Sequence, residues 1–104
     1  MLEILWTKHI KEKMRQYNIS KKRILRIFEN PERKEEGIVE NTICAMQGAG
    51  RKRYFEIWIM YQKEKGKIKM ISCWKYSGKS PEGKVIFPEK ILKEMKNKNP
   101  QLAS

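Results

Sequence analysis

The longest strand-forming stretch of the chain is KRYFEIWIMYQKEKGKIKMISCWKY, residues 52–76. Phe55, Ile57 and Ile59 alternate with other side chains, which is the period of a strand with one buried face. The segment KEKG, which ends at Gly66, favours a turn between two such strands. A regular second strand would place five residues on one face: Ile68, Met70, Ser72, Trp74 and Tyr76. The stretch therefore predicts an antiparallel hairpin.

Strand-forming residues also precede this hairpin. Three β-rich runs follow one another, at residues 38–47, 52–62 and 67–76. The run Gly48-Ala49-Gly50 suits a hairpin connection between the first two. Residues 32–37 are charged, and we expect them to form a loop. Residues 2–6 predict a further short strand.

Helix signals flank the predicted strands. We expect two helices in the first third of the chain, over residues 8–17 and 21–30. Thr7 and Ser20 are suitable N-caps for them, and Asn18 accepts the left-handed conformation between them. Pro88 is typical of the first turn of a third helix.

These elements define an expected fold. Their order is β-α-α-β-β-β-α, which indicates an α+β fold with an antiparallel sheet and with the helices packed on one face. A chain of 104 residues is long enough for one core, so we expect a single domain over residues 1–96. We expect residues 97–104 to form a disordered tail.

The charge of the chain points to a polyanionic partner. Lys and Arg number 24 against 12 Asp and Glu, a formal net charge of +12. Basic and aromatic residues are interleaved at Arg51-Lys52-Arg53-Tyr54-Phe55 and at Trp74-Lys75-Tyr76. Such a surface can hold a phosphate backbone by charge and bases by stacking. We therefore expect the partner to be nucleic acid, with RNA favoured.

Several other classes lack the residues they require. Cys44 and Cys73 lie within strand-like runs without CxxC spacing, which indicates small buried side chains rather than metal ligands. The chain has one His and no Asp, so neither a metal cluster nor a Ser-His-Asp triad is expected. Gly78-Lys79-Ser80 resembles the end of a P-loop, but Pro81 prevents the helix that must follow. We expect no cofactor.

The chain shows no targeting pattern. The first residues carry an early acid and then Lys8, unlike a secretory signal. The longest apolar run, residues 57–61, is too short to span a bilayer. We expect a cytoplasmic protein that does not enter membranes.

The stretch HIKEKMRQYNIS, residues 9–20, resembles the first helix of a family of small bacterial and archaeal proteins of unassigned role. Their pattern is roughly His-Ala-x-x-Arg-Met-x-x-Arg-Gly-Ile-Ser, and four residues match it: His9, Met14, Ile19 and Ser20. Lys13 and Tyr17 replace its two arginines. The layout of the first three-quarters of the chain is also similar to the RelE-like and BrnT-like toxins. That resemblance implies cleavage of RNA and an acidic antitoxin partner.

Cleavage of RNA without a metal requires groups that move protons and cations that stabilise the phosphorane. The candidate catalytic residues are His9, Lys75 and Arg53. Of these, His9 is best suited to proton transfer, because it alone has an ordinary pKa near neutrality. Six further residues are candidates for RNA binding: Arg15, Arg51, Lys52, Lys22, Arg26 and Tyr76.

Other interpretations remain open at this point. His9 could have a structural role at the first turn of its helix. The protein could be a non-catalytic RNA-binding module, or a basic interaction protein that docks an acidic partner. The two first helices also resemble a helix-turn-helix that reads DNA, but no third helix precedes the sheet.

Overall fold

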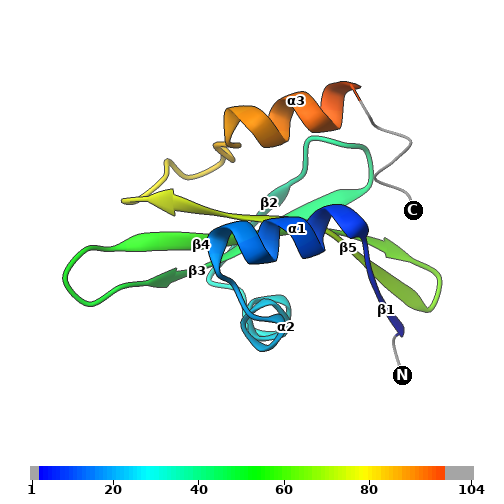
Figure 1. Ribbon diagram of the computed structural model, residues 1–104, viewed down its shortest axis with the longest axis horizontal. Helices are drawn as coiled ribbons and strands as arrows, with labels where there is room; N and C mark the ends of the chain where they lie inside the picture. Colours follow the sequence, from blue (N-terminus) through cyan, green and yellow to red (C-terminus); the bar gives the residue numbers. More distant parts are fainter. Residues whose placement is uncertain (1–2, 98–104) are drawn as a thin grey trace.

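The computed structural model describes residues 3–97 of the chain. Three helices surround one sheet (Figure 1). The elements are β1 (Glu3–Trp6), α1 (Lys8–Tyr17), α2 (Lys21–Glu29), β2 (Arg33–Glu36), β3 (Thr42–Ala49), β4 (Phe55–Glu64), β5 (Lys67–Ser77) and α3 (Glu89–Asn97). Asn97, the first residue of the predicted tail, ends α3, and residues 98–104 lie outside the described residues.

The sheet has five strands in the order β1-β5-β4-β3-β2. Strands β2 to β5 form an antiparallel meander, whereas β1 lies parallel to β5. The α+β class is thus confirmed, and the prediction of a fully antiparallel sheet is wrong. Alternation within a strand shows which face it buries, but it does not show which neighbour the strand chooses or in which direction it runs.

The predicted loop over residues 32–37 contains strand β2. Arg33 pairs with Met46 and Glu35 with Cys44 of β3. Arg33 and Glu35 are partly buried, and their side chains form an ion pair with an Nη2–Oε2 distance of 3.3 Å. β2 is an edge strand, where charged side chains are common because they discourage pairing with other molecules. Because its residues are charged, the sequence pattern predicted a loop instead of a strand.

The predicted hairpin of β4 and β5 is confirmed, with an irregularity that changes which face β5 shows. Met60 pairs with Ser72, but the next residue, Tyr61, pairs with Met70, so Ile71 is the extra residue of a β-bulge. Met70 consequently packs in one core, and Trp74 in the other. The prediction of a single face shared by the even-numbered residues 68–76 is therefore wrong.

The caps predicted for the first two helices are confirmed. Thr7 accepts a hydrogen bond from the backbone N–H of Ile10 at 3.1 Å, and Ser20 accepts one from Arg23 at 3.1 Å. Asn18 ends α1 in the left-handed region, with φ 56°. Pro88 precedes α3 and accepts a hydrogen bond from the N–H of Leu92 at 2.9 Å.

Each face of the sheet carries its own core. On one face, residues from α1 and α2 pack on alternate strand residues such as Ile57 and Ile59. On the other, Ile91 and Met95 of α3 pack with Trp58, among others. The helices therefore cover both faces, and the prediction of one covered face is wrong. A continuous apolar run like residues 57–61 is what a strand needs when both faces are buried.

The buried carboxylate of Glu56 holds the loop between β5 and α3 against the sheet by hydrogen bonds. The Glu56 carboxylate accepts hydrogen bonds from Trp58 Nε1 at 2.9 Å and from the N–H of Ser80 at 3.1 Å. Arg33 reaches the same loop, donating to the carbonyl oxygen of Pro81 at 2.9 Å. These contacts place residues 78–80 beside the end of the sheet.

Candidate nucleic-acid interface

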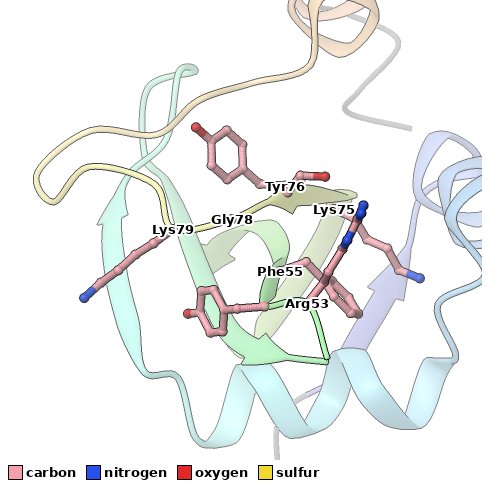
Figure 2. A pocket seen from close by; sticks show the side chains of 8 residues that line it. Arg53, Phe55, Lys75, Tyr76, Gly78 and Lys79 are labelled. Atoms are coloured by element: carbon pink, nitrogen blue, oxygen red, sulfur yellow. The ribbon is translucent and has the colours of Figure 1, made fainter. Parts of the chain in front are cut away.

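A hollow of about 670 Å³ opens at the end of the sheet where β4 begins and β5 ends. Its lining comes from the two strands and the segments beside them: Arg53, Tyr54, Phe55, Lys75, Tyr76, Ser77, Gly78 and Lys79. In Figure 2, Lys79 extends away from Arg53 and Lys75. We call this the hairpin-end hollow. It combines three cations with three aromatic rings, the groups that bind phosphates and bases.

Lys75 and Tyr76 reach the hollow from opposite faces of β5. Lys75 pairs with Ile57, and its Nζ lies 5.4 Å from the centre of the Phe55 ring. An ammonium group at this distance from a ring face is held by cation–π attraction. Tyr76 packs against the core that α3 covers. The two residues face opposite ways, and both border the hollow.

The segment before β4 supplies Arg53 and Tyr54. Gly50 makes its turn possible, because φ is 94° there and a Cβ would lie 2.0 Å from the carbonyl oxygen of Arg53. Arg51 and Lys52 are exposed in the same segment, but they do not line the hollow. Of three consecutive predicted cations, the turn thus directs one into the hollow.

The edge of the Tyr54 ring packs against β3 at Gly48. A Cβ at Gly48 would be 2.4 Å from Tyr54 Cε1, so the ring occupies the space that a side chain would need. The N–H of Gly78 donates to the carbonyl oxygen of Tyr54 at 3.0 Å. Partial desolvation and the nearby carboxylates of Glu56 and Glu32 raise the pKa of Tyr54, so its phenol stays protonated at neutral pH.

His9 lies outside the hollow, in a mostly buried polar network. Its Nδ1 is 2.8 Å from Oε2 of Glu94 in α3, and its Nε2 is 2.9 Å from Oγ of Ser72 in β5. Lys13 Nζ lies 3.2 Å from the other carboxylate oxygen of Glu94. Burial lowers the pKa of His9 and outweighs the opposing attraction of Glu94.

The order Ser72, His9, Glu94 is that of a nucleophile, a base and an orienting acid. Ser72 is fully buried, however, and it does not line the hairpin-end hollow. The network instead joins α1, β5 and α3. The structure therefore favours the structural alternative for His9 over the predicted catalytic role.

The remaining predicted residues do not gather with Arg53. Arg15 is exposed and borders a separate hollow of about 350 Å³ on α1, together with Lys11, Met14, Asn18 and Ile19. Lys22 and Arg26 are exposed on α2 and line neither hollow. The structure thus brings together Arg53, Lys75 and Tyr76 from the predicted set.

Tyr54, Phe55 and Lys79 line the hollow but were not predicted as site residues. The interleaved run Arg51–Phe55 was a signal for the first two, because it placed aromatic rings beside cations in the sequence. Lys79 had no comparable signal. It reaches the hollow because Glu56, 23 residues earlier in the sequence, holds Ser80.

Other kinds of site have little support in the described chain. Burial raises the pKa of both Cys44 and Cys73 to about 12, so neither is a reactive thiolate. Within residues 3–97, no three His, Cys or Glu side chains are arranged to hold a metal ion. No helix in that range is both long and apolar enough to cross a membrane.

No protein-family model matches the chain, and no curated protein or solved structure matches it.

Proposed function

We propose that this protein binds RNA in the hairpin-end hollow, in the manner of a RelE-like toxin. One observation carries the proposal: Arg53 and Lys75 border the same hollow as Tyr54, Phe55 and Tyr76. Cations bind phosphates by charge, while exposed rings stack on bases. The net charge of +12 would draw a polyanion toward the molecule before these contacts form.

Binding of a fluorescein-labelled RNA 12-mer, measured by anisotropy over a series of NaCl concentrations, tests the proposal. Arg53→Ala and Lys75→Ala should each weaken binding and lower the slope of log K against log [NaCl] by about 0.7, since each removes one phosphate contact. Lys65→Ala is the matched control, because Lys65 is an exposed cation in the turn at the other end of β4. Equal losses in all three variants would contradict a site at the hollow.

A second candidate function is cleavage of the bound RNA. The observation that favours it is that the cations Arg53 and Lys75 and two tyrosines border one hollow. The ribose 2′-hydroxyl would pass its proton to a water molecule and its oxygen would attack phosphorus, the P–O5′ bond would break, and the 5′-oxygen would take up a proton. Arg53 and Lys75 would stabilise the phosphorane, and the protonated Tyr54 could supply the proton to the 5′-oxygen.

Expression in a bacterial host tests this candidate. Wild type should arrest growth, and its RNA products should end in a 2′,3′-cyclic phosphate. Lys75→Ala should relieve the arrest, whereas the control Lys65→Ala should not. If the purified protein binds RNA but does not cut it, the result would contradict cleavage and would agree with binding as the function.

A further inference from the structure

Tyr54 stands apart from the other large aromatic residues of the chain. It is 45% exposed, whereas Trp58 and Trp74 are 1% and 0% exposed. An exposed aromatic ring in the lining of a hollow offers a surface on which a base can stack. Tyr54 lines the hairpin-end hollow.

The ring is also held in place before any ligand arrives. Its edge packs against Gly48, where a Cβ would approach Cε1 to 2.4 Å and the hydroxyl oxygen to 2.7 Å. Its backbone is fixed to the loop after β5 by the hydrogen bond from Gly78, at 3.0 Å. A ring that is already fixed loses little side-chain entropy when something stacks on it.

The charges around the hollow determine how a nucleotide would be oriented in it. Arg53 and Lys75 supply the cations. On the side of Gly48, a Glu32 oxygen accepts a hydrogen bond from the Gly48 N–H at 3.1 Å, so a carboxylate lies near Tyr54. A phosphate is attracted to the cations and repelled by this acid, which leaves the Tyr54 ring to an uncharged part of the ligand, the base.

We infer that Tyr54 is a base-stacking platform, and that it makes the hollow selective for unpaired nucleotides. In a duplex each base is already covered on both faces by its neighbours, so its face is not open to the ring. The inference rests on the proposed function and adds to it the residue that separates single strands from duplexes. The cations alone would not favour the single strand, because a duplex carries its phosphates at higher density.

Competition binding tests the inference, with a labelled RNA 12-mer displaced by the same strand free or annealed to its complement. Wild type should prefer the single strand. Tyr54→Ala should weaken single-strand binding roughly 5- to 150-fold, the equivalent of one lost base stack. It should leave duplex binding and the salt slope unchanged. Tyr54→Phe should keep the preference, because the ring remains.

Gly48→Ala is the second variant, and it leaves Tyr54 in the sequence. The new methyl group would push the ring from its position, so the preference should fall as in Tyr54→Ala. Thermal unfolding of each variant confirms that the fold is kept. An unchanged preference in folded Tyr54→Ala would overturn the platform while RNA binding stands. A wild type that binds neither RNA would overturn the proposed function and the platform together.

Discussion

The sequence pattern predicts an exposed side chain for Glu56, and the structure shows a buried one. In the alternating pattern it faces away from Phe55 and Ile57, as a solvent-exposed glutamate would on a half-buried strand. The structure buries it completely, where it accepts hydrogen bonds from Trp58 and Ser80. Arg33 lies 3.9 Å from the same carboxylate. Ser80 and Arg33 come from distant parts of the chain, which periodicity does not reveal.

Removing this carboxylate should destabilise the protein. Glu56→Ala leaves Trp58 Nε1 and the Ser80 N–H without an acceptor, so we expect the free energy of unfolding to fall by about 3 kcal/mol. Urea unfolding monitored by tryptophan fluorescence measures this change. The matched control is Glu82→Ala, an exposed glutamate in the same loop, which should change stability by less than about 0.5 kcal/mol. Similar losses in both variants would contradict the role of Glu56.

At the scale of elements, the sequence predicted helix caps and the β4–β5 hairpin correctly, whereas it missed features that depend on strands farther apart or on register. Thr7, Ser20 and Asn18 marked the helix ends correctly, because capping depends on residues within one turn. The bulge at Ile71 and the strand at residues 33–36 depend on the neighbouring strand, so the sequence pattern missed both. The candidate site residues show the same difference between nearby and distant contacts. Arg53, Lys75 and Tyr76 lie on adjacent parts of one hairpin and border one hollow, whereas the position of His9 depends on α3.

The network that joins α1 and α3 predicts a pH dependence of stability. Burial holds the pKa of His9 below its ordinary value of 6.5, so the folded state binds a proton less readily than the unfolded state. Stability should therefore be complete above about pH 6.5 and should fall as pH drops below it, by at most about 1.4 kcal/mol per pH unit. The groups that face His9 are Glu94, Lys13, Glu12 and Ser72.

Urea unfolding at several pH values between about 7.5 and 5.5 tests this prediction. His9→Gln removes the titrating group and should flatten the dependence over this range, although it lowers stability throughout. Nuclear magnetic resonance of the His9 ring should give a pKa below 6.5. A wild type whose stability rises on acidification would contradict the buried, neutral histidine.

At the scale of the whole molecule, composition indicated one property that no single element shows. The sequence predicted a strongly cationic surface, and the structure exposes cations on α1, on α2, in the β3–β4 connection and around the β4–β5 turn. The sequence did not reveal that the helices would lie on both faces. That arrangement depends on where the loop after β5 carries α3, and the hydrogen bonds of Arg33 and Glu56 help to fix that loop.

The excess charge should make salt act in opposite directions on folding and on RNA binding. Charges of one sign repel each other in the compact state, and NaCl screens them, with a Debye length of about 8 Å at physiological ionic strength. Tm should therefore rise between about 20 mM and about 300 mM NaCl at pH 7, by about 4–8 °C for each kcal/mol of repulsion relieved. Over the same range RNA affinity should fall steeply, because counterion release is lost.

Differential scanning calorimetry and anisotropy on one preparation measure the two responses together. A double variant, Lys63→Gln with Lys65→Gln, lowers the charge at the sheet end away from the hollow. It should raise Tm at low salt and leave the RNA salt slope unchanged, since neither residue lines the hollow. A Tm that falls as NaCl is added would show that attractive pairs such as Glu94 with Lys13 outweigh the general repulsion. In that case the cations would be distributed for stability rather than for a polyanion.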